Sequence, residues 1–415
     1  MSHTFKSVRS RVVHQSLSLG VLGLLAGTAM AATPTEMKAI VHTGTGGPET
    51  LKLQTVPVRQ PTGDQVLIKV YAAAVNPVDW KMLSGRMGGP RRGGAPGASG
   101  APGGGAGGPP GGGAGGPPGG GAPGGGAGGP PGGGAGGPPG GGGAPGGGAS
   151  SESTPGMDVA GVVAAVGPDV TTVKPGDAVF SMLGRGVSGL NGGYAQYALA
   201  PASNVIPKPE KLTYEQAAGL GTVGMTAMRS VLSAKVTSGE KVLVNGAAGG
   251  VGSSVVQIAK AQGAYVIGTA SARHDKYLKS IGTDQIVDYT KGPLADQVKD
   301  VDVVIDTVGG TSADDAMKTL KKGGTFLSVA AFGMDAKCAA AGVTCAGGGG
   351  PNAGGPTEGE LLGDVAKLVN EDKFSIHVEK TFPLAEAGKA DEFSKGGHAE
   401  GKIILVVDAA KARSK

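Results

Sequence analysis

The middle of the chain alternates short apolar runs with segments of helical periodicity. Apolar runs of strand length occupy residues 242–244, 265–269, 286–287, 301–305 and 325–329. Helical patterns occupy residues 276–281, 313–320 and 360–370, the last with its apolar side chains on one face. Such alternation predicts an α/β fold, a doubly wound parallel sheet of the Rossmann type with helices on both faces.

The first of these strands ends in a glycine-rich turn, GAAGGVG, from Gly246 to Gly252. Backbone N–H groups and a helix N-terminus in this context can hold a pyrophosphate. The spacing is G-x-x-G-x-x-G, because Ala248 stands where the common pattern has its second glycine. The turn follows a strand, opens a helix and leads to a second strand, which favours a dinucleotide site over a turn without a ligand. The predicted cofactor residues here are Gly246, Ala247, Gly249, Gly250, Val251 and Gly252.

The end of the second strand indicates which dinucleotide is bound. NAD sites usually carry an acidic residue there for the ribose 2′-hydroxyl, whereas this chain has Ser271 and Arg273, with Lys276 nearby. A guanidinium can bind a 2′-phosphate through two N–H groups. Asp275 lies past the strand end, inside the next helix. The pattern favours NADPH; the alternative is that Arg273 is a solvated residue opening that helix.

The N-terminus has the pattern of a secretory signal peptide, residues 1–32. Basic Lys6, Arg9 and Arg11 precede an apolar run from Leu17 to Met30, with small residues at the expected cleavage site. The run is shorter than the roughly 20 residues of a spanning helix, so we expect export and no transmembrane span in the mature chain. The alternatives are an uncleaved anchor and a cytoplasmic product that starts at Met37.

A second unusual segment, residues 87–153, consists almost entirely of glycine, proline and alanine, with the octapeptide GGPPGGGA repeated. An eight-residue repeat does not fit the three-residue period of collagen. A segment without apolar side chains cannot bury a core, so we predict a disordered insertion. Its role is left open between a gate, a surface anchor and a tolerated expansion.

Several motifs together resemble the medium-chain dehydrogenase/reductase superfamily, in its zinc-free quinone oxidoreductase (zeta-crystallin-like) branch. They are MKAIVHTG, VYAAAVNPVDW, PGMDVAGVVAAVG, VKPGDAVF, GGYAQYALAP, the glycine segment, VIDTVGG, KGGTFLSV and GKIILVV. The resemblance covers residues 37–85 and 154–407 and implies a discontinuous GroES-like β-barrel domain beside the Rossmann domain. We expect the GroES-like catalytic domain at 37–86 and 154–204, the NADPH-binding domain at 205–373, and a return to the catalytic domain at 374–415.

The resemblance also implies site residues. Asn76 matches the family's active-site Asn, whose amide can donate a hydrogen bond to an acceptor oxygen, and Thr226 matches a Thr beside the nicotinamide. Asn76 could instead serve a local turn, and Thr226 could bond a preceding carbonyl. Tyr289 matches a position that in relatives meets the 2′-phosphate, although an aromatic at a strand end could instead be structural. Val308 and Lys402 are also assigned to the cofactor. Asp79 and Trp80 either line the pocket or pack.

No catalytic metal is expected. Zinc-dependent relatives have a Cys where this chain has Asn76, and Gly-His-Glu where it has Gly156-Met157-Asp158. Zinc sites need three or four Cys, His or carboxylate ligands. The two cysteines, Cys338 and Cys345, are too few for a structural Cys₄ site; a disulfide and two free thiols are both left open.

The predicted activity is reduction of a quinone, or of the C=C bond of an α,β-unsaturated carbonyl, by NADPH, with the substrate a small molecule. The alternatives are a zinc-free alcohol dehydrogenase and an exported cofactor-binding scaffold without catalysis. The formal net charge of +5 falls by three once the basic residues of the signal peptide leave. Without a basic patch interleaved with aromatics, no nucleic-acid partner is expected. Oligomeric state is left open, with a homodimer as the candidate.

Overall fold

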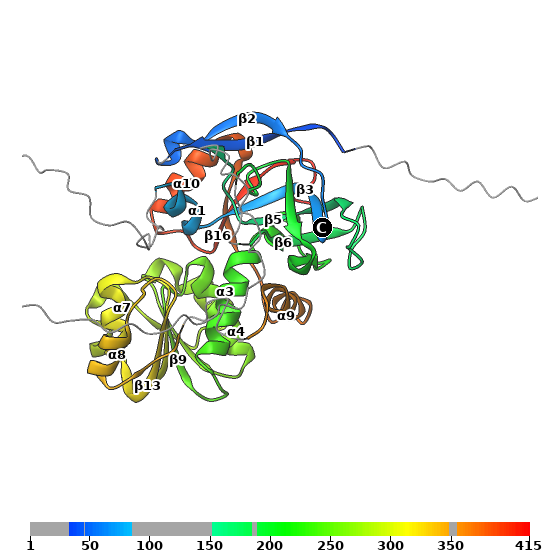
Figure 1. Ribbon diagram of the computed structural model, residues 1–415. Helices are drawn as coiled ribbons and strands as arrows, with labels where there is room; N and C mark the ends of the chain where they lie inside the picture. Colours follow the sequence, from blue (N-terminus) through cyan, green and yellow to red (C-terminus); the bar gives the residue numbers. More distant parts are fainter. Residues whose placement is uncertain (1–32, 45, 85–151, 185–188, 348–354) are drawn as a thin grey trace, which may run out of the picture. The chain divides into compact units, whose positions relative to one another are not determined.

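The computed structural model describes residues 33–44, 46–84, 152–184, 189–347 and 355–415 (Figure 1). The predicted signal peptide and almost all of the predicted insertion lie outside the described residues. The chain divides into two units, Met1–Pro34 and Thr35–Lys415, and the fold below is that of the second. Within the described ranges, no helix is long and apolar enough to cross a membrane.

Six parallel strands form one sheet, in the order β11-β10-β9-β12-β13-β14. Their bounds are β9 Lys241–Asn245, β10 Tyr265–Thr269, β11 Gln285–Val287, β12 Val301–Asp306, β13 Leu320–Ser328 and β14 Thr344–Cys345. The predicted α/β fold class with a parallel Rossmann-like sheet is confirmed. Strand β14 was not predicted, because two residues carry no periodic signal.

Alternate side chains of the strands face two separate cores. In β9, Val242 and Val244 pack in one apolar cluster, and Leu243 packs in another. This follows from the two-residue side-chain period of a strand. The first cluster includes residues of α3 (Gly221–Ser233), α4 (Gly250–Ala261) and α9 (Glu358–Asn370). The second includes residues of α7 (Gly310–Met317) and α8 (Asp335–Ala341), so helices cover both faces of the sheet (Figure 1).

Short helices connect these elements. Their bounds are η3 Ala272–His274, α5 Asp275–Ser280, η4 Tyr289–Lys291 and α6 Leu294–Gln297. Helix α9 begins at a capping box: Thr357 Oγ1 accepts a hydrogen bond from Glu360 N–H, and Glu360 Oε2 accepts one from Thr357 N–H. The two bonds satisfy two backbone donors that the helix itself leaves without acceptors. Strand β14 and helix α8 are joined by a disulfide between Cys345 and Cys338, whose Cα atoms are 5.7 Å apart.

The remaining strands form two further sheets, and only β15–β16 is a parallel pair among them. The larger sheet has the order β15-β16-β3-β5-β6-β8, with β7 paired to β3, and β1, β2 and β4 form the smaller one. Their bounds are β1 Glu36–Thr43, β2 Lys52–Pro57, β3 Gln65–Val75, β4 Glu152–Ser153, β5 Asp158–Val166, β6 Ala178–Met182, β7 Tyr197–Pro201, β8 Val205–Pro207, β15 Val378–Pro383 and β16 Lys402–Val406. Strand β16 pairs with β3, so the C-terminal strand returns to the sheet of the first part of the chain.

Strand β4 corrects the end of the predicted insertion. Glu152 and Ser153 fall within 87–153, yet they pair antiparallel with Thr43 and His42 of β1. The sequence could not show this, because a Glu-Ser pair has no apolar pattern and its partners lie more than a hundred residues away. Glu152 and Ser153 therefore belong to the smaller sheet.

Further short helices accompany the strands of these two sheets. Their bounds are η1 Pro48–Thr50, α1 Pro77–Leu83, η2 Ala202–Asn204, α2 Tyr214–Ala218, η5 Leu384–Glu386 and α10 Ala387–Lys395. Trp80 Nε1 of α1 donates a hydrogen bond to Ser394 Oγ of α10, 3.2 Å away. Trp80 was expected either to line the pocket or to pack. This hydrogen bond joins α1 to α10 and fits the packing role.

Candidate functional site

The turn between β9 and α4 requires glycine at two positions. Gly246 has a φ of +79°, a conformation that side chains disfavour. A Cβ on Gly252 would lie 2.1 Å from the carbonyl oxygen of Gly246, so a side chain there would push the helix away from the turn. These two glycines allow the close approach of helix α4 to strand β9 that the sequence predicts.

The same turn leaves backbone donors open at the start of α4. The first bond of the helix runs from Ser253 N–H to Gly249 carbonyl, 2.8 Å. Gly250 lies next to the parallel bridge between Gly249 and Gly401, which turns its N–H toward the Gly401 carbonyl. Within the described part of the chain, the N–H groups of Val251 and Gly252 have no acceptor. Ala247 is fully buried and its N–H donates to the Thr269 carbonyl at 3.1 Å, so its contact with the cofactor stays a prediction. A helix N-terminus with free N–H groups and a side-chain-free approach fits a pyrophosphate.

A buried polar network fixes the strand ends around the turn. Asn245 donates to Asp306 Oδ1 at 2.8 Å and accepts from Thr269 Oγ1 at 2.8 Å. Thr269 Oγ1 in turn accepts from Gly246 N–H at 3.0 Å. The Asp306 carboxylate also accepts from the N–H groups of Val308 and Gly309. The carboxyl ends of β9, β10 and β12 are thereby held together, at the edge where open parallel sheets bind ligands.

Other predicted cofactor residues lie around this edge. Tyr289 and Val308 are exposed to 52% and 53%, so both side chains are open to a ligand. Lys276 is exposed on α5, and Ser271 precedes η3 with an extended backbone. Their positions after β10, β11 and β12 are compatible with the predicted assignment, which stays a prediction.

Arg273 makes two specific hydrogen bonds although its side chain is exposed. Its Nε donates to His274 Nε2 at 2.8 Å, and its Nη2 donates to the carbonyl of His398 at 2.5 Å. The other ring nitrogen of His274, Nδ1, lies 2.7 Å from Glu400 Oε2. Arg273 is thus neither free in solvent nor part of α5; it belongs to η3 and is tied to the segment before β16.

A buried amide joins Asp158 and Lys402 in the larger sheet. Asn76 accepts from Lys402 Nζ at 2.6 Å and donates to Asp158 Oδ2 at 2.9 Å. Lys402 also donates to the Val75 carbonyl at 3.0 Å. Burial raises the pKa of Asp158, which the Lys402 charge opposes, and burial lowers the pKa of Lys402. Asn76 is 1% exposed, so in this arrangement its amide bridges two buried charges.

Asn76, Asp158 and Lys402 form a buried centre, and helix α3 contacts it through Thr222. Its N–H and its hydroxyl both donate to Asp158 Oδ1, each at 2.8 Å. Thr226, predicted to lie beside the nicotinamide, is one turn further along and half-buried. Its carbonyl accepts from Ser230 Oγ at 2.7 Å. The segment before β16 meets the glycine turn, where Gly401 N–H donates to the Ala248 carbonyl at 2.9 Å. The buried centre and the turn are therefore contiguous.

Two further carboxyl groups share one tyrosine hydroxyl. Tyr194 OH lies 3.2 Å from Asp79 Oδ2 and 3.3 Å from Asp391 Oδ1, and Asp79 Oδ2 also accepts from Asn76 N–H at 2.8 Å. Burial, with the nearby Asp391 charge, raises the pKa of Asp79 to about 8. Burial raises the pKa of Asp391 to about 7. A hydroxyl has one proton to donate, so this cluster holds an additional proton near neutral pH.

We expect the Asp79–Asp391 cluster to make stability fall as pH rises. Both folded-state pKa values lie above the ordinary value of an Asp, so the folded state binds more protons than the unfolded state between about pH 4 and pH 8. The favourable contribution is complete below about pH 4, declines as pH rises across this window, and is gone once pH has passed the folded-state values of about 7 and about 8. The free energy of unfolding measured in urea should be higher at pH 5 than at pH 9, by about 2 kcal/mol or more.

The variant Asp391→Asn isolates this contribution. An amide keeps an acceptor for Tyr194 and does not ionise, so the pH dependence should become shallower. Asp364→Asn on the exposed side of α9 is the matched control and should leave the pH dependence unchanged. An Asp391→Asn protein with the same slope as the unmodified chain would contradict the assignment.

Sequence reasoning missed Thr222, Tyr194 and Asp391, and mentioned Asp158 only as the place of a missing zinc ligand. Asp158 had a usable signal, since an acid that opens an apolar strand needs a partner when it is buried. Tyr194 and Asp391 had none, because they are separated by 197 residues and meet only in the fold.

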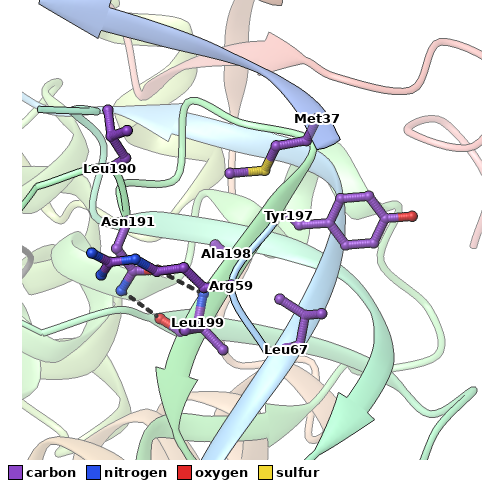
Figure 2. A pocket seen from close by; sticks show the side chains of 8 residues that line it. All are labelled: Met37, Arg59, Leu67, Leu190, Asn191, Tyr197, Ala198 and Leu199. Atoms are coloured by element: carbon purple, nitrogen blue, oxygen red, sulfur yellow. Dashed lines mark hydrogen bonds between the residues drawn. The ribbon is translucent and has the colours of Figure 1, made fainter. Parts of the chain in front are cut away.

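Neither a metal cluster nor the pocket of Figure 2 belongs to this site in the described chain. No group of three or more His, Cys, Asp or Glu side chains that could hold a metal ion occurs in the described ranges. Figure 2 shows a pocket over β1, β3 and β7, in which Asn191 holds the Leu199 backbone by two hydrogen bonds. The pocket shares no residue with the glycine turn or the buried centre, so we assign it no role.

Two family models match the chain. One is described as a zinc-binding dehydrogenase and covers residues 281–405; the other is an alcohol dehydrogenase GroES-like domain and covers residues 142–210. Together they match parts of the parallel sheet and of the larger antiparallel sheet.

Curated relatives match much longer stretches. The chain is 33% identical over 315 residues to a quinone oxidoreductase of Mus musculus, covering 73% of this chain and 76% of that protein. It is 30% identical over 386 residues to the chloroplastic NADPH-dependent alkenal/one oxidoreductase of Arabidopsis thaliana, covering 91% of this chain and 81% of that protein.

Solved structures share the fold over almost their whole length. A quinone oxidoreductase of Coxiella burnetii is 29% identical, with a TM-score of 0.66 over 90% of this chain and 99% of its own. A mycobacterial protein solved in complex with NADPH is 26% identical, with a TM-score of 0.65 over 89% of this chain and all of its own.

Proposed function

Because the chain belongs to the quinone oxidoreductase branch of the medium-chain dehydrogenase/reductase superfamily, we propose that it is an NADPH-dependent, zinc-independent reductase. The named activities of its relatives support the general activity: the chain is an oxidoreductase that uses a nicotinamide cofactor. The proposed acceptor is a quinone or the C=C bond of an α,β-unsaturated carbonyl, a small molecule in either case.

The observation that carries the proposal is the glycine turn with open backbone donors at the start of α4. The free N–H groups of Val251 and Gly252 would hold the pyrophosphate, and Tyr289 and Val308 would flank the rest of the cofactor. Bound NADPH would supply the hydride. The preference for the phosphorylated form is supported by Arg273 and by the lack of an acid at the end of β10.

The protein's own part in the reaction is to position the groups of the site and to hold the buried charges of Lys402 and Asp158 in place. Asn76 fixes Lys402 and Asp158 on either side of its amide, and Thr222 fixes Asp158 against α3. This keeps β3, β5, β16 and α3 in one arrangement beside the turn. Asn76 and Thr226 remain the proposed residues nearest the nicotinamide.

Zinc independence is supported by residue chemistry. Of the three positions compared with zinc-dependent relatives, two hold Asn76 and Met157, and neither side chain is a usual zinc ligand. Asp158, at the third, is satisfied by Asn76 and Thr222. We therefore expect full activity after dialysis against a chelator, with the metal content measured in the same sample.

The proposal is tested with purified full chain, NADPH and either 1,2-naphthoquinone or an aliphatic enone. The absorbance of the reduced nicotinamide should fall only when protein and acceptor are both present. Oxidation of alcohols with NADP⁺, and no reduction of either acceptor, would instead indicate an alcohol dehydrogenase. Tight NADPH binding with no turnover on any acceptor would favour the scaffold function.

We also propose export after cleavage of residues 1–32. The basic and apolar pattern of the first 32 residues supports it, and so does the disulfide between Cys338 and Cys345, since disulfides persist mainly in oxidising compartments. N-terminal sequencing of the native product would give a residue near Thr33. An N-terminus at Met37, recovered from the cytosolic fraction, would contradict export.

A further inference from the structure

Arg273 is held by one edge of its guanidinium. The hydrogen bonds from Nε to His274 and from Nη2 to the His398 carbonyl occupy the side of the group that faces η3 and the segment before β16. A guanidinium has five N–H donors, and these two bonds use two of them. In the described part of the chain, the other three N–H groups have no acceptor. Two of these three form the Nη1–Nη2 end, the geometry that binds a phosphate through two N–H groups.

His274 can accept from Arg273 only in one tautomer. If Nε2 accepts the Arg273 proton, the ring proton must sit on Nδ1, and Nδ1 faces Glu400 Oε2 at 2.7 Å. A carboxylate at that place accepts the Nδ1 proton and so fixes the tautomer. His274 is 9% exposed, which also limits rotation of its ring.

Glu400 is itself fixed from several sides. Its backbone N–H donates to Glu379 Oε2 at 2.5 Å, and its Oε1 lies 3.4 Å from His377 Nε2. The next residue, Gly401, bonds the carbonyl of Ala248 in the glycine turn. The carboxylate that orients His274 is thus anchored to the same turn that would hold the pyrophosphate.

We infer that His274 and Glu400 are positioning residues for cofactor selectivity: they hold Arg273 so that its Nη1–Nη2 end faces a 2′-phosphate. This rests on the proposed NADPH site. Neither residue would touch the cofactor; both act through the orientation of Arg273. The selectivity determinant therefore includes a residue 127 positions after Arg273 in the sequence, on the segment that leads into β16.

The test is calorimetric binding of two probes to the full chain, adenosine 2′,5′-bisphosphate and 5′-AMP, which differ only in the 2′-phosphate. We expect the unmodified chain to bind the bisphosphate about tenfold or more tightly than AMP. Arg273→Ala, His274→Ala and Glu400→Ala should each lose most of this ratio while AMP affinity stays the same. Lys279→Ala, an exposed lysine of α5, is the matched control and should keep the ratio.

Two further variants distinguish a loss of Arg273 orientation from general damage to the structure. His274→Gln keeps one acceptor for Arg273 and one donor for Glu400, so it should retain most of the ratio. Arg273→Ala/His274→Ala should lose no more than Arg273→Ala alone, because the histidine acts only through the arginine.

The outcomes distinguish this inference from the proposed function. An unmodified chain that binds both probes equally would overturn the NADPH proposal and, with it, the inference. A ratio that Arg273→Ala abolishes but His274→Ala and Glu400→Ala preserve would overturn the inference alone. Equal loss of both probes in His274→Ala would also overturn it, since positioning of Arg273 acts only on the 2′-phosphate.

Discussion

Replacement of Lys402 by methionine is expected to lower the free energy of unfolding by about 3–5 kcal/mol, because it leaves a buried carboxylate without a counter-charge. Lys402 is 3% exposed and Asp158 is fully buried. Asn76 accepts from the lysine and donates to the aspartate, so the loss of the ammonium also leaves the amide oxygen without its donor. Urea unfolding followed by circular dichroism measures the change.

The surface pair Lys321–Asp302 provides the matched control. The Lys321 side chain is 51% exposed, so Lys321→Met should change stability by less than about 1 kcal/mol. The double variant Lys402→Met/Asp158→Asn removes both charges and lets Asn76 turn its amide, so it should recover part of the lost stability. A double variant less stable than Lys402→Met would contradict the charge argument.

Replacement of Gly252 by alanine is expected to damage the glycine turn and cofactor binding together. The added Cβ would lie 2.1 Å from the Gly246 carbonyl oxygen and 2.9 Å from Ala247 Cα, so turn and helix must separate. Overpacking of this kind costs about 1–3 kcal/mol. We expect NADPH affinity to fall about tenfold or more, measured by calorimetry, because the open N–H groups of α4 move with the helix.

The variant Gly249→Ala distinguishes an effect on cofactor binding from an effect on stability. Its Cβ would meet only the Gly246 carbonyl, at an ordinary 3.6 Å, and its backbone is extended, so stability should change little. NADPH binding should nonetheless weaken, since the methyl group would stand where the pyrophosphate approaches. Gly363→Ala, an open position in α9, should affect neither property. Unchanged NADPH affinity in Gly249→Ala would contradict a pyrophosphate at this turn.

The periodic parts of this fold could be predicted from the sequence. The second strand, Tyr265–Thr269, has the predicted bounds, and the glycine turn opens a helix as expected. These elements follow from local apolar spacing and from glycine geometry, both of which are visible in a short window. The pairing of Glu152–Ser153 with β1 was missed, because short strands depend on distant partners.

The polar contacts of the site could not be predicted in the same way. Asn76 and Lys402 are 326 residues apart, and Arg273 meets His398 across 125 residues. Sequence patterning locates each residue on an element, but only the packed fold decides which polar groups satisfy one another when water is excluded. The assigned roles of Asn76 and Arg273 therefore remain predictions that the bonding partners now make specific.

Calorimetry of the full chain with NADPH and with NADH tests the central claim most directly. We predict that NADPH binds at the glycine turn about tenfold or more tightly than NADH, and that Gly249→Ala weakens both coenzymes whereas Arg273→Ala weakens only NADPH. Absence of heat with either coenzyme would contradict the dinucleotide site itself, and tighter binding of NADH would contradict the role given to Arg273.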